Sequence, residues 1–232
     1  MWKKHIGIII ITLIASTSFW LSSCEPAPDF PVTPAISFQR FEFREIQGSS
    51  LDSLIFYINF QDGDGDLGLQ NFENFPPYHE FSIYVDPITR DTLKYGDNDT
   101  LPAFNCQDYE ILRRDRPDNI PLIDTLYVIR NPNHNNFFVD FLFERDGEFV
   151  VYNWALERCT KSFHDRFPLL TDSPGRRPVE GVLRYGIRGG FRLLFRNDLM
   201  KLRVSIQDRA LNRSNIIETE PFRIEDIIRP PS

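Results

Sequence analysis

The sequence motifs of several enzyme classes are missing from this chain of 232 residues. It has no Gly-x-Ser-x-Gly turn, no His-Glu-x-x-His zinc helix, no phosphate-binding loop and no dinucleotide-binding glycine pattern. Histidine, the commonest general base, occurs four times, and only His79, His134 and His164 follow residue 24. We therefore expect the protein not to be an enzyme.

Cysteine is also scarce, with three residues in the chain. Cys24 lies at the end of an N-terminal apolar segment and is set apart from the rest of the chain. The rest of the chain therefore holds an even pair, Cys106 and Cys159. In an extracytoplasmic protein such a pair predicts a disulfide, and the alternative is two separate thiols. Cys159 precedes His164 by five residues, but a disulfide would remove the thiol that a Cys-His catalytic pair needs.

Basic residues are too few for a protein that binds polyanions. The chain has 26 Lys and Arg against 33 Asp and Glu, a net charge of −7. Nucleic acids and anionic lipid surfaces attract clusters of lysine and arginine. We expect no nucleic-acid partner, and the carboxylate excess suits a soluble or cation-binding surface.

Aromatic residues, in contrast, are abundant, with 21 Phe and 8 Tyr. Short runs of aromatic and β-branched residues alternate with turn signals such as Asn131-Pro-Asn and Arg188-Gly-Gly. The predicted strands are 36–46, 54–60, 80–85, 125–130, 137–143, 148–154, 179–187, 191–195, 199–207 and 216–224. Many short strands with few helical periods predict a mainly β fold, an antiparallel Ig-like β-sandwich.

We expect one domain over residues 35–228, although two small domains would also fit the length. The polar stretch from about 86 to 124 predicts a loop-rich insertion with one short helix at 109–113. Residues 24–34 precede the domain and contain four prolines, which favours an extended tether.

The N-terminal segment has the three parts of a secretory signal. Lys3 and Lys4 precede an apolar run from 6 to 21, and Leu21-Ser-Ser-Cys24 follows. This resembles the lipobox of bacterial lipoproteins, in which Cys24 is lipidated and becomes the mature N-terminus. An uncleaved transmembrane anchor is the alternative, but a span needs about 20 apolar residues, and polar residues interrupt this run.

The lipobox resemblance implies that residues 1–23 form a signal peptide and that fatty acyl chains on Cys24 bind a membrane. Two or more chains hold a soluble domain stably at a bilayer surface. We expect a cell-envelope location at the outer membrane, on either face.

An aspartate-rich loop, Asp62-Gly-Asp-Gly-Asp-Leu-Gly68, follows a predicted strand. Ca²⁺ takes six to eight oxygen ligands, so the alternating carboxylates predict a calcium site at Asp62, Asp64 and Asp66. Glu73 falls at the last ligand position of an EF-hand loop, but Leu67 stands where that loop needs glycine. A solvated Asp-Gly turn is the alternative.

A second polar turn, Asp208-Arg-Ala-Leu-Asn212, lies between two late strands. Loops at one end of an Ig-like sandwich cluster, so Asp208 is a further predicted ligand. A self-satisfied Asx turn is the alternative.

The lipobox, the loop at 60–68 and the segments 178–185 and 202–215 together resemble a group of Gram-negative lipoproteins of uncharacterised activity. The resemblance implies an Ig-like sandwich and an envelope location, and a fold alone implies no activity. We expect a non-enzymatic binding or structural module, stabilised by calcium, with a protein or glycan partner. The alternative is a glycan-active enzyme accessory or a glycan-binding lipoprotein.

Overall fold

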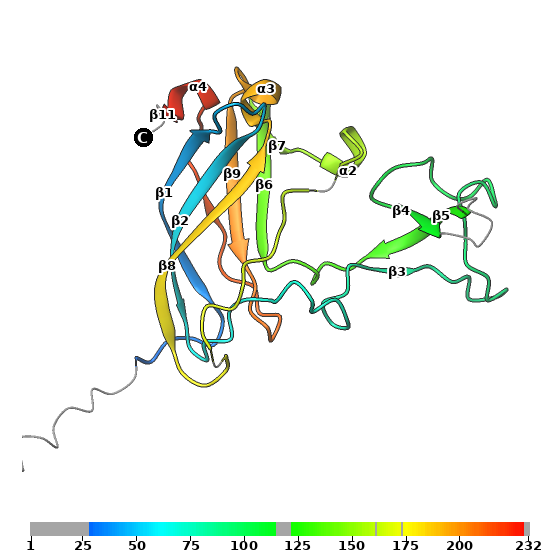
Figure 1. Ribbon diagram of the computed structural model, residues 1–232, viewed down its shortest axis with the longest axis horizontal. Helices are drawn as coiled ribbons and strands as arrows, with labels where there is room; N and C mark the ends of the chain where they lie inside the picture. The colour runs from blue at the N-terminus through cyan, green and yellow to red at the C-terminus, as the bar shows by residue number, and fades with distance from the viewer. Residues whose placement is uncertain (1–27, 115–121, 161, 173, 230–232) are drawn as a thin grey trace, which may run out of the picture.

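The computed structural model describes residues 28–114, 122–160, 162–172 and 174–229. Strands dominate this part of the chain and form three sheets. Two four-stranded sheets enclose one hydrophobic core, and a three-stranded sheet projects from one side (Figure 1). The prediction of a mainly β, antiparallel sandwich is confirmed.

The first sheet has the spatial order β11-β1-β2-β8. Its strands are β11 (Ile228–Arg229), β1 (Ala35–Glu45), β2 (Asp52–Asp62) and β8 (Val179–Gly189). The central strand β2 pairs antiparallel with β1 and β8, and the short β11 adds parallel to β1. Alternate residues of β2 are buried in the core because strand side chains alternate between faces; they are Leu54, Phe56, Ile58 and Phe60.

The second sheet has the order β10-β9-β6-β7. Its strands are β10 (Ile217–Glu218), β9 (Met200–Ile206), β6 (Phe137–Arg145) and β7 (Glu148–Val151). The pairing of β6 with β9 places inward-facing residues opposite one another, and all of them are buried: Phe137 with Ile206, Val139 with Val204, Phe141 with Leu202, and Phe143 with Met200.

The distribution of strands over the two sheets is that of an Ig-like sandwich. Strands A, B and E of that fold share one sheet, and C, F and G share the other. In chain order, β1, β2 and β8 correspond to strands A, B and E, and β6, β9 and β10 correspond to strands C, F and G. The β2–β6 and β9–β10 connections consequently leave the sandwich at the same end.

The third sheet lies within the β2–β6 connection. It consists of β3 (Phe81–Ile83), β4 (Tyr109–Arg114) and β5 (Leu122–Arg130), in the order β3-β5-β4. An aromatic cluster that includes Tyr84, Tyr95, Tyr109 and Tyr127 gives it a small core of its own. We call this sheet, with its connecting loops, the inserted sheet.

The predicted helix at 109–113 is wrong, because these residues form strand β4. Six residues of β4 pair with β5, and Tyr109 is buried in the aromatic cluster. Tertiary pairing outweighs the weak helix preference of so short a segment.

The predicted strand at 191–195 is also wrong, because Phe191–Phe195 form helix α3. The buried carboxylate of Asp52 accepts hydrogen bonds from the backbone N–H groups of Phe191 (3.0 Å) and Arg192 (2.8 Å). It thereby satisfies the free donors at the start of the helix. Phe191 and Phe195, one turn apart, both enter the core.

Three further predicted strands are shorter than expected. β3 covers only three residues of the predicted strand 80–85. β7 ends at Val151, and helix α2 (Trp154–Glu157) follows. The late segment forms β10 and, after a gap, one further bridge between Phe222 and Met200. Helix α4 (Ile224–Ile227) begins where the predicted strand ends.

The N-terminal predictions concern residues that the structure does not describe: the signal segment 1–23, Cys24 and the first part of the tether. In the described ranges, no helix has the length and apolar character needed to cross a membrane.

Candidate cation site at the loop end of the sandwich

Three aspartates meet at the end of the sandwich where β2 and β9 terminate. Asp62 is the last residue of β2, Asp66 follows in the glycine-rich loop, and Asp208 lies just after β9. One carboxylate oxygen from each lies within 4.8 Å of the others. A backbone bridge between Leu67 and Asp208 holds the two connections together.

The glycines of the loop are required by close backbone contacts. A side chain at Gly63 would collide with the carbonyl oxygens of Phe30 and Pro31, and one at Gly65 would collide with that of Arg177. Gly65 also has a φ of +69°, a conformation that side-chain-bearing residues rarely adopt. The loop is therefore clamped between the entry to β1 and the entry to β8.

The loop carboxylates are only partly satisfied by hydrogen bonds. Asp62 Oδ2 accepts from the backbone N–H of Asp66 (3.1 Å), and Asp66 Oδ2 accepts from that of Ala210 (3.0 Å). The Oδ1 atoms of Asp62, Asp64 and Asp66 are buried and have no hydrogen-bond partner within the described residues. Buried polar atoms without partners are uncommon and need a physical explanation.

Asp208 belongs both to the cluster and to its own turn. Its Oδ1 accepts from the backbone N–H of Asn212 (2.7 Å), and its Oδ2 accepts from the Asn212 side-chain amide (2.8 Å). These two hydrogen bonds form the Asx turn that the sequence offered as the alternative to a ligand role for Asp208. A carboxylate oxygen has more than one lone pair, so the turn leaves Asp208 able to coordinate an ion.

The electrostatics of the cluster oppose three simultaneous negative charges. Burial, reinforced by the charges of Asp64 and Asp66, raises the pKa of Asp62 to about 7. Burial, with the charges of Asp208 and Asp64, raises the pKa of Asp66 to about 6. Burial also raises the pKa of Asp208. A proton or a cation at this place relieves the repulsion.

Glu73, a predicted ligand, is not brought into the cluster. Its carboxylate forms a two-point ion pair with the Arg209 guanidinium, at 2.5 Å from Nη2 to Oε1 and 2.9 Å from Nη1 to Oε2. The guanidinium lowers the pKa of Glu73. Glu73 therefore holds the turn after the aspartate loop against the β9–β10 connection.

Two arginines that sequence reasoning missed organise the same end. Arg209 also donates to the Gly68 carbonyl (3.3 Å). Arg166 donates to the backbone carbonyls of Glu73 (3.0 Å) and Tyr78 (2.6 Å). The only sequence signal was the position of Arg209 directly after Asp208, because bonds to backbone carbonyls leave no residue pattern.

The predicted cysteine pair forms a disulfide between Cys106 and Cys159, with the Cα atoms 4.9 Å apart. The bond joins the inserted sheet to the segment after α2. The Cys159 sulfur is consequently not a free thiol, although His164 is near it in the sequence.

Comparisons with protein-family models, with curated proteins and with solved structures found no match.

Substitution of Gly65 tests how tightly the loop is clamped. We expect Gly65→Ala to lower the free energy of unfolding by roughly 2–5 kcal/mol, because backbone strain and overpacking add. Gly48→Ala is the matched control, since Gly48 has a φ of +72° but open space around it. It should cost about 1 kcal/mol. Equal costs in urea denaturation would contradict the clamped loop.

The raised pKa values predict how the stability of the metal-free protein depends on pH. Between about pH 4 and pH 7 the folded state binds more protons at Asp62 and Asp66 than the unfolded chain does, since their pKa values rise from 3.8 to about 7 and about 6. The contribution of these groups to stability therefore falls as pH rises through this window.

The measurement is urea denaturation from pH 4 to pH 8, for the metal-free wild type and for the Asp62→Asn, Asp66→Asn variant. The variant should gain stability relative to wild type as pH rises. A difference that is constant with pH would show that neither burial nor repulsion raises the pKa of the two carboxylates.

Proposed function

We propose that this chain is a lipid-anchored protein of the cell envelope without a catalytic role. Its Ig-like sandwich uses a calcium ion at the loop end as a structural element and presents a binding surface to a partner. The observation that carries the calcium proposal is the pair of buried Oδ1 atoms on Asp62 and Asp66, which have no hydrogen-bond partner among the residues that the structure describes. The two residues are 0% and 8% exposed.

A cation accounts for this cluster better than structural packing does. Burying a carboxylate without a counter-charge is costly, and three carboxylates with one oxygen each within 4.8 Å of the others repel one another. The described cluster offers only carboxylate oxygens, the ligands that hard cations prefer. Calcium tolerates the irregular geometry of loop ligands, whereas Mg²⁺ demands near-ideal octahedral coordination.

The proposed ion would fasten several connections at once. Asp62 and Asp66 come from the β2–β6 connection, and Asp208 comes from the β9–β10 connection. The segment before β8 packs on the same loop, because the Leu69 N–H donates to the Phe167 carbonyl (3.0 Å) and the Leu170 N–H to that of Leu67 (3.2 Å). One ion would thus stabilise the whole loop end.

The envelope location is supported by two independent features of the chain. The lipobox-like Leu21-Ser-Ser-Cys24 supplies a lipidation signal. The Cys106–Cys159 disulfide is typical of proteins outside the reducing cytosol.

Calcium should raise the melting temperature of the metal-free protein. Extracellular calcium modules have dissociation constants of about 10⁻⁴–10⁻³ M, so 10 mM calcium should raise the midpoint by roughly 3–10 °C. Asp66→Asn should abolish this shift but leave the metal-free midpoint equal or higher, because it removes a repelling charge. Differential scanning fluorimetry with calcium and with chelator measures both values.

Asp91→Asn is the matched control, since Asp91 is an exposed aspartate outside the cluster. It should keep the full calcium shift. An absent shift in wild type, or one that persists in Asp66→Asn, would reject the calcium site.

The membrane anchor is tested separately through Cys24. The protein isolated from its native host should partition into detergent, and the mass of its N-terminal peptide should show acyl chains on Cys24 and loss of residues 1–23. Cys24→Ser should lose the acyl mass. An unmodified cysteine, or a retained N-terminal segment in the wild type, would contradict lipidation.

A further inference from the structure

We propose that the cleft between the sandwich and the inserted sheet binds a neutral oligosaccharide. This inference rests on the proposed role of the chain as a binding module and names its ligand class, but it requires neither calcium nor the lipid anchor.

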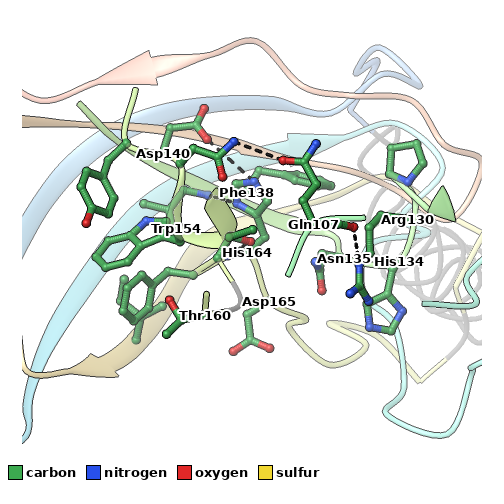
Figure 2. Close-up of a pocket in the computed structure, with 18 of the residues that line it drawn as sticks. Gln107, Arg130, His134, Asn135, Phe138, Asp140, Trp154, Thr160, His164 and Asp165 are labelled. Carbon is green, nitrogen blue, oxygen red and sulfur yellow. Dashed lines mark hydrogen bonds and ion pairs between the residues drawn. The ribbon is translucent and has the colours of Figure 1, made fainter. Parts of the chain in front are cut away.

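The cleft has a volume of about 1030 Å³, at the upper end of the range for ligand pockets. Figure 2 shows Gln107 and Arg130 from the inserted sheet on one side, with Asp140 and His164 facing them from the sandwich. Trp154 of α2 lines its far part. Clefts between two structural units are common ligand sites.

The two walls of the cleft are linked covalently and by hydrogen bonds. The Cys106–Cys159 disulfide spans them, and the Asn153 side-chain amide donates to Gln107 Oε1 (3.2 Å). Arg130 donates to the Cys106 carbonyl (3.0 Å) and thereby fixes the cysteine to the inserted sheet. A preformed site binds with a smaller loss of conformational entropy than a flexible one.

The charges that line the cleft balance. Its charged side chains comprise three acids and three arginines: Glu80, Asp140, Asp165, Arg130, Arg188 and Arg213. A site for an anionic or cationic ligand would carry an excess of the opposite charge. A long acyl chain would bury these six charged side chains and offer them no hydrogen bonds, which is costly. A neutral ligand rich in hydroxyl groups fits the lining best.

Asp140 and His164 form a donor and acceptor pair suited to sugar hydroxyls. His164 Nδ1 accepts the backbone N–H of Val139 (3.2 Å), which assigns the proton of the neutral ring to Nε2. Burial lowers the pKa of His164 and keeps the ring neutral. Nε2 lies 3.8 Å from Asp140 Oδ1, too far for a direct hydrogen bond, so a hydroxyl can bond to both groups.

The lining also offers apolar surface for the faces of sugar rings. Tyr152 and Phe163 are half-buried and line the cleft beside Trp154. Trp154 itself packs edge-on against Phe141 and Phe163. Sugars combine apolar ring faces with hydroxyl edges, and this mixture of aromatic and polar groups is complementary to both.

The experiment titrates the protein from residue 24 to residue 232 with neutral tetrasaccharides of α-glucan, β-glucan, mannan and chitin type, by calorimetry. Sulfated and sialylated oligosaccharides and an unrelated tetrapeptide serve as probes of other ligand classes. Trp154 is the one tryptophan after residue 23, so its fluorescence reports whether a bound probe lies in the cleft.

We expect at least one neutral tetrasaccharide to bind and to change Trp154 fluorescence. Asp140→Asn and Gln107→Ala should each weaken binding by about tenfold. Glu220→Gln, at an exposed carboxylate outside the cleft, should leave it unchanged. An unchanged melting midpoint in each variant shows that the fold is intact.

Three results would overturn the proposal: no neutral glycan binds at millimolar concentration, only the charged or peptide probes bind, or binding survives both cleft variants. Titrations in calcium and in chelator separate this inference from the calcium site. Glycan binding without any calcium shift would reject the calcium site alone, whereas a calcium shift without glycan binding would reject the cleft ligand alone.

Discussion

The mutual repulsion of buried carboxylates is the constraint on which the loop end of this sandwich depends. Asp62, Asp66 and Asp208 converge because Ig-like topology brings the β2–β6 and β9–β10 connections to one end. Glycines at 63 and 65 permit this convergence, since side chains there would collide with neighbouring backbone carbonyls. The fold thus concentrates negative charge where water is excluded, and a proton or a cation relieves it.

The segment 164–170 connects this charged end with the cleft. Phe167 accepts a backbone hydrogen bond from Leu69 beside the aspartate loop, and Asp165 exchanges backbone hydrogen bonds with Phe137 at the edge of β6. His164, the residue before Asp165, lines the cleft. A cation that orders the loop would therefore steady one wall of the proposed glycan site, which gives the two proposals a common structural basis.

Local patterns predicted the sandwich and where the aspartates lie along it. The aromatic and β-branched runs and the turn signals between them are short-range signals, so the mainly β content and the place of the loop at Asp62 followed from them. Glu73 could not be placed from sequence, because its pairing with Arg209 arises only when two distant connections pack together. The helix at 191–195 depends in the same way on the distant carboxylate of Asp52, although the spacing of Phe191 and Phe195 by one helical turn was a readable sign.

The most direct test is a pair of crystal structures, one grown with millimolar calcium and one after chelation. We expect an ion at about 2.3–2.6 Å from carboxylate oxygens of Asp62, Asp66 and Asp208 in the first crystal, with the loop better ordered than in the second. Identical structures with water or a direct carboxyl–carboxylate hydrogen bond at the centre of the cluster would contradict it.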